Sequence, residues 1–84
     1  MKGFEQIGAL KAKAEGFLPF INQEIEKIIK NKVKDQKVIE ELLDILLNYQ
    51  YLGVGEEEFK KLNEYYRQID KEAANNYDQF FEEI

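Results

Sequence analysis

The sequence predicts an all-α protein, a compact bundle of four or five helices formed by one domain that spans residues 1–84. Apolar residues recur with the helical period of about 3.6 residues along most of the chain. With one proline and five glycines, the chain also has few forced breaks. Its 84 residues are 44% apolar, which suffices for one thin core.

The first part of the chain predicts two helices that are separated at Gly16. One helix is expected over residues 2–15, where Gly16 would end it. The other is expected over residues 18–32, because Pro19 suits the first turn of a helix. The apolar stripes of these two helices consist of Phe4, Ile7, Leu10 and Ala14, followed by Ile21, Ile25, Ile28 and Ile29.

A third helix is predicted over residues 36–50, with Asp35 as its N-cap. Its apolar residues cover an arc of roughly 200°, which is wider than the usual one-sided stripe. We therefore expect this helix to lie at the centre of the bundle, with neighbours on two sides. Leu42, Leu43 and Leu46 should be among the most buried residues.

Residues 56–84 keep one apolar phase throughout, and a single helix of about 29 residues would be about 43 Å long. Such a helix would overhang its shorter neighbours. Either the chain breaks near Asp70, which would cap a fifth helix from Lys71, or a second chain covers the overhang. The break is favoured, because Asp70 is a good cap and Asn75 and Asn76 are weak helix formers.

The composition removes most catalytic chemistry. There is no Cys and no Trp, and no His, Ser or Thr occurs anywhere in the sequence. Serine, cysteine and threonine nucleophiles, disulfides and sites built on thiolate or imidazole ligands are therefore excluded. The sequence predicts a protein that is not an enzyme, with no catalytic residue, no metal ligand and no cofactor.

One acidic pattern could still serve a magnesium-dependent nucleotide hydrolase. Glu40, Glu41 and Asp44 place carboxylates on one face of the third helix. Such a site needs a second acidic pair on a neighbouring helix. Glu24 and Glu26 are two residues apart and point to different sides of their helix. The favoured interpretation of this pattern is a solvated helix face.

Charge is distributed unevenly between the two halves of the chain. Residues 1–37 contain eight Lys and five acidic residues, a net charge of +3, and residues 38–84 carry −8. The basic cluster consists of Lys27, Lys30, Lys32, Lys34 and Lys37. Helix-end electrostatics explain this cluster more simply than phosphate binding does, so nucleic-acid binding is not expected. The acidic half could instead imitate nucleic-acid phosphates.

Aromatic residues are concentrated near the C-terminus, where they could form either a core or an interface. We predict a non-catalytic protein–protein interaction or regulatory module that associates with itself as a homodimer. The alternative is an acidic inhibitor that binds a basic nucleic-acid-handling protein. The predicted contact residues are Tyr66, Ile69, Tyr77, Phe80, Phe81 and Ile84.

The sequence predicts a cytoplasmic protein without membrane contact. No apolar run approaches the roughly 18 residues of a membrane span. The first 16 residues contain no uninterrupted apolar stretch, so they do not resemble a signal peptide.

Overall fold

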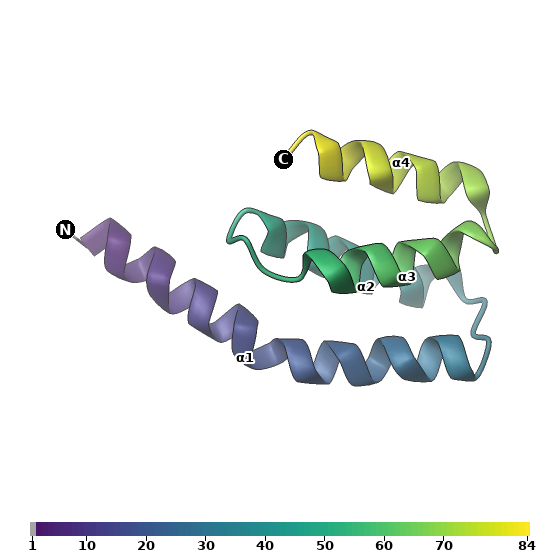
Figure 1. The fold of residues 1–84 in the computed structure, drawn as a ribbon, viewed down its shortest axis with the longest axis horizontal. Helices are drawn as coiled ribbons and strands as arrows, with labels where there is room; N and C mark the ends of the chain where they lie inside the picture. Colours follow the sequence, from purple (N-terminus) through teal and green to yellow (C-terminus); the bar gives the residue numbers. More distant parts are fainter. Residues whose placement is uncertain (1) are drawn as a thin grey trace.

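The computed structural model describes the backbone of residues 2–84 and the side chains of residues 8–84. It shows an all-α four-helix bundle with α1 at Lys2–Lys30, α2 at Gln36–Gln50, α3 at Glu56–Arg67 and α4 at Lys71–Glu82 (Figure 1). No strand occurs within residues 2–84. The predicted fold class is therefore confirmed.

The two helices expected before residue 32 are one continuous helix, so the predicted end at Gly16 is wrong. Both Gly16 and Pro19 lie inside α1. An interior proline removes one backbone hydrogen bond and bends the helix without having to end it. Figure 1 shows this bend in α1, with the N-terminal part of the helix leading away from the bundle. The apolar stripe keeps its phase across the bend, which favours helix on both sides.

The end of α1 is set by a left-handed residue rather than by a glycine. Lys32 has a φ of 52°, and the amide of Val33 donates to the carbonyl of Ile28 at 3.0 Å. The amide of Lys32 donates to the carbonyl of Ile29 at 3.2 Å. This is the Schellman arrangement, which satisfies the last carbonyls of a helix and turns the chain toward α2.

The boundaries of α2 agree with the predicted range. The Asp35 carboxylate accepts hydrogen bonds from the amides of Lys37, at 3.0 Å, and Val38, at 3.4 Å. Asp35 is thus the N-cap that the sequence indicated. The helix packs against α1, α3 and α4, as expected for a helix with a wide apolar arc.

A tight turn over residues 51–55 connects α2 to α3. Gly53 and Gly55 have φ values of 70° and 84°, which an L-residue rarely adopts. A Cβ atom at Gly55 would lie 3.1 Å from the side chain of Leu46. Gly55 therefore permits both the turn and the close approach of α3 to the core.

The chain breaks at Asp70, and the alternative of one long helix over residues 56–84 is wrong. The Asp70 carboxylate accepts a hydrogen bond from the amide of Ala73 at 3.0 Å and another from Gln36 at 2.8 Å. The cap thus starts α4 and also ties the break to the start of α2. As a result α4 folds back along α3 (Figure 1).

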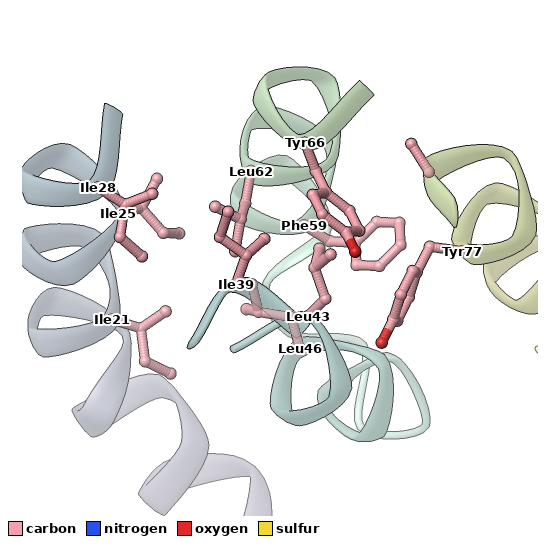
Figure 2. Packing of buried hydrophobic residues seen from close by; sticks show 11 residues of the cluster. Ile21, Ile25, Ile28, Ile39, Leu43, Leu46, Phe59, Leu62, Tyr66 and Tyr77 are labelled. Carbon is pink, nitrogen blue, oxygen red and sulfur yellow. The ribbon is translucent and has the colours of Figure 1, made fainter. Parts of the chain in front are cut away.

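The four helices share one core, in which side chains from α1, α2, α3 and α4 meet (Figure 2). Leu43 and Leu46 are fully buried, as predicted, whereas Leu42 is only half-buried on the flank of α2. The core consists of Ile21, Ile25, Ile28, Ile39, Leu43, Leu46, Phe59, Leu62, Tyr66, Ala74 and Tyr77.

Candidate interaction surface

Two of the residues predicted at an interface lie in the core of the chain itself. Tyr66 is fully buried and Tyr77 nearly so, with their rings edge to face at 6.3 Å. The Tyr66 hydroxyl donates to Glu40, and the Tyr77 hydroxyl donates to Asp44 at 2.8 Å. Burial, followed by these hydrogen bonds, raises the pKa of both tyrosines. This pairing holds α3 and α4 against α2.

The remaining predicted contact residues differ in exposure. Phe81 stacks on the buried ring of Phe59 with centroids 5.0 Å apart, and Ile69 is half-buried. Phe80 and Ile84 are 48% and 43% exposed. Only these last two offer a free apolar edge on the C-terminal segment.

The acidic pattern on α2 does not assemble into a carboxylate site. Glu40 and Asp44 accept hydrogen bonds from tyrosines, while Glu41 is exposed. Glu24 pairs with Lys27 within α1, and Glu26 pairs with Lys61 of α3. Among the side chains that the structure describes, no three acidic residues come close enough to hold a metal ion. The geometry therefore gives the hydrolase interpretation no second acidic pair.

A polar contact that the sequence did not indicate joins α3 to α4. The amide nitrogen of Asn63 donates to the carbonyl of Ala74, at 3.0 Å, and to Asp78, at 2.8 Å. Arg67 donates to Asp78 and Asn75, and the Asp78 hydrogen bond raises the pKa of Arg67. The Asn63 Oδ1 is buried without a hydrogen-bond partner. All these groups face one another, so their role is to hold the α3–α4 hairpin.

Part of the lysine cluster borders an open pocket of about 450 Å³ at the end of the bundle where α1 stops. The Tyr65 hydroxyl closes one side by donating to the carbonyl of Val33 at 2.7 Å. Its lining residues are Ile29, Lys32, Lys34, Tyr65, Gln68 and Ile69. The polar lining is thus two flexible ammonium groups, one amide and the Tyr65 hydroxyl, which already donates to Val33, without a preorganised set of ligands.

The exposed apolar side chains gather on α1 and α2. Within residues 8–84, the large apolar residues that stay exposed are Leu10, Phe17, Phe20, Val38, Ile45, Tyr51, Phe80 and Ile84. Five of these eight lie on the first two helices. Phe17 is 56% exposed and Phe20 is 65% exposed, although either ring could cover a large apolar area.

The exposed residues of α1 lie on the flank that faces away from α3. Asn22 donates to Glu58 and Glu26 pairs with Lys61, so the flank that carries Asn22 and Glu26 faces α3. Helical spacing places Phe17 and Phe20 on the opposite flank. Because α1 packs against both α2 and α3, this opposite flank is the one beside α2.

The exposed residues of α2 lie on the flank beside α1. Glu40 and Asp44 contact α3 and α4, so they mark the far flank of this helix. The near flank carries a second apolar stripe with four-three-four spacing, which is the repeat that pairs helices. This stripe consists of Val38, Leu42, Ile45 and Tyr49.

These two flanks form one surface, which we call the α1–α2 face. Its exposed members are Leu10, Phe17, Phe20, Val38 and Ile45, and half-buried Leu42 and Tyr49 lie between the helices. Exposed large apolar side chains on one side of two neighbouring helices are common on surfaces that bind other molecules. The wide apolar arc of residues 36–50 was its signal in the sequence. The two phenylalanines were missed because Phe17 lies between the two expected helices and Phe20 in the first turn of the second, so they were not expected to share one helix flank.

The first two residues of the α1 stripe, Phe4 and Ile7, lie outside the described side chains. Over the part of the chain that the structure covers, no helix combines the length and the apolar character that a membrane crossing requires. Comparison of this chain with protein-family models, with curated proteins and with solved structures finds no match.

Proposed function

We propose that this chain is a non-catalytic helical module that acts by binding another protein, through the α1–α2 face. The observation that carries the proposal is the exposure of Phe17 and Phe20 next to an apolar stripe with helix-pairing spacing on α2. Half-buried Leu42 and Tyr49 belong to the same stripe and pack against the core. We place the module in the cytoplasm and assign it no cofactor.

The absence of catalysis in this proposal rests on residue chemistry. The chain contains no His, Cys, Ser or Thr, so proton transfer and nucleophilic attack would rest on carboxylates, lysines and tyrosines. The two buried tyrosines already donate to Glu40 and Asp44. These four groups satisfy one another, which supports a structural role for them.

The acidic-inhibitor alternative has less support from the contacts. Several carboxylates of the acidic half are engaged inside the molecule: Glu58 with Asn22, Asp78 with Arg67 and Asn63, and Asp70 with Gln36. Salt separates the two functions. A complex on the α1–α2 face should persist at high salt, because its contacts are apolar, whereas an acidic mimic should lose its basic partner steeply.

Site-specific photo-cross-linking tests the proposed function. A photoreactive phenylalanine analogue at Phe20 should give cross-links to one defined polypeptide in extracts of the cells that produce the protein. The same analogue at Gln79, an exposed position on α4, is the matched control. Equal labelling from both positions, or none from position 20, would reject the α1–α2 face as a binding surface.

A further inference from the structure

We propose that a second copy of this chain covers the α1–α2 face, with the two α1 helices packed antiparallel across a two-fold axis beside Pro19. The inference rests on the proposed function, because it names the partner of the same surface. Three features support it: the spacing and charges of a stripe on α1, the overhang of that helix, and the area of the molecule.

The outward flank of α1 carries a stripe whose spacing is the same in both directions along the helix. Its members follow three-four-three-four-three spacing, which keeps them on one side of a helix. They are Leu10, Lys13, Phe17, Phe20, Glu24 and Lys27, and all six are exposed. Two large apolar rings occupy the centre of the stripe, and charged residues lie on both sides of them.

An antiparallel pair centred between Leu18 and Pro19 matches this stripe with itself. Phe17 of each copy then lies opposite Phe20 of the other, so four rings leave water together. Lys13 of each copy lies opposite Glu24 of the other, which pairs opposite charges twice across one axis. Within its own chain Glu24 forms an exposed ion pair with Lys27 at 3.5 Å, which is weak enough to rearrange.

The length of α1 supplies the second argument. The helix has 29 residues and is about 43 Å long, whereas α2 has 15 residues and is about 22 Å long. The N-terminal arm of α1 therefore extends beyond its neighbours (Figure 1). In an antiparallel pair this arm lies along the C-terminal half of the second copy's α1, where Leu10 lies opposite Lys27, whose aliphatic stem can cover it.

The accessible area agrees with an unfilled interface. The chain exposes 5987 Å², whereas a compact monomer of its 10.0 kDa mass exposes about 5,200 Å². The excess is similar to the roughly 800 Å² that each partner contributes to a standard interface. Within residues 8–84, five large exposed apolar residues lie on α1 and α2, and two lie on the C-terminal segment. A two-fold contact on Phe80 would also bring the acidic residues Glu82 and Glu83 of the two copies close together, and like charges repel.

Disulfide trapping tests the register. The chain has no native cysteine, so only the introduced thiols can form a disulfide. The K13C/E24C variant should form a covalent dimer under oxidising conditions, because the thiol at position 13 of each copy lies opposite the thiol at position 24 of the other. Positions 13 and 24 are 11 residues apart on one helix, or about 16 Å, which is too far for a disulfide within one chain. Each single variant should stay unlinked alone, and the two should link when they are mixed.

The matched control is K71C/E82C on α4, which also replaces an exposed Lys and an exposed Glu that are 11 residues apart in one helix. Efficient trapping through the α4 pair, or no trapping of K13C/E24C above that control, would overturn the proposal. A K13C variant that links to itself would overturn the antiparallel register.

Charge reversal adds a readout that does not depend on oxidation. K13E and E24K should each weaken the dimer about threefold to tenfold in Kd, and the K13E/E24K double variant should restore it. If the double variant is weaker than either single one, the paired arrangement is wrong. Cross-links from position 20 to a different polypeptide, with K13C/E24C unlinked, would keep the proposed function and reject the second copy as its partner.

Discussion

At the scale of single residues, most of the C-terminal aromatic side chains hold the bundle together. Tyr66 and Tyr77 bring their rings into the core and direct their hydroxyls to carboxylates at its edge. Phe81 covers Phe59, and only Phe80 keeps a largely free face. The aromatic cluster that looked like one interface in the sequence therefore divides into core rings and one exposed ring.

Alkaline pH should unfold the protein through these two tyrosines. Their pKa values are raised in the fold, while the unfolded chain has the ordinary value of about 10. The contribution of these two tyrosines to the free energy of unfolding is complete below pH 10. It falls as the pH rises above 10, because the tyrosines of the unfolded chain lose their protons first. The ultraviolet absorbance of tyrosinate, followed with circular dichroism, should show Tyr66 and Tyr77 ionising only as the helices melt. Complete ionisation of all five tyrosines in a folded chain would refute this.

Leu46 is the residue whose truncation should be most damaging. It is fully buried in the shared core, and its side chain also packs under Gly55. We expect Leu46→Ala to lower the free energy of unfolding by about 2–5 kcal/mol, measured by urea denaturation. Ile84→Ala is the control and should change it far less, because Ile84 is 43% exposed and lies outside the α1–α2 face. Similar effects of both substitutions would mean that the core is misplaced.

At the scale of helices, caps were predictable from the sequence and the course of α1 was not. The carboxylates of Asp35 and Asp70 accept hydrogen bonds from amides no more than three residues further along the chain. Both helix starts can therefore be predicted from the local sequence. Gly16 and Pro19 are also local signals, but the apolar stripe on both sides of them outweighs their unfavourable propensity. The helical phase of the apolar residues on both sides of Gly16 and Pro19 is therefore a better guide to this element than those two residues alone.

Gly16→Ala distinguishes the continuous helix from the two-helix interpretation. Gly16 is helical, and no atom outside its own helix lies within 4 Å of where a Cβ would be. Alanine should therefore raise the free energy of unfolding by about 0.5–1 kcal/mol, measured by thermal or urea denaturation. If Gly16 instead ended a helix in a left-handed conformation, the substitution would destabilise the protein.

The Asp70 cap should make the α3–α4 junction sensitive to acid. Hydrogen bonds from the Ala73 amide, and then from Gln36, hold the pKa of Asp70 below its ordinary value. Its contribution is complete above about pH 4 and is lost as the pH falls through the lower folded-state pKa. Asp70→Asn can still cap the helix but cannot titrate, so it should remove this part of the acid response. Asp70→Ala should lower the melting temperature at neutral pH. An unchanged melting curve would contradict a stabilising role for the cap.

At the scale of the whole molecule, the candidate surface was predictable only in part. The wide apolar arc of α2 predicted neighbours on two sides of that helix, but two residues of the arc, Val38 and Ile45, are exposed. Phe17 and Phe20 could be placed on one flank only once α1 was seen to be continuous, because both residues must belong to the same helix to share a flank. The predicted self-association remains a prediction, now placed on the α1–α2 face instead of the C-terminal segment.

Sedimentation equilibrium on three proteins tests the central claim most directly. The unaltered chain should be a dimer at micromolar concentration, and Phe80→Asp should remain one, because α4 lies outside the contact. Phe20→Asp should sediment as a monomer with unchanged helical content, because a carboxylate replaces the ring at the centre of the interface. A monomeric unaltered chain, or a dimer that Phe80→Asp dissolves and Phe20→Asp does not, would contradict the account.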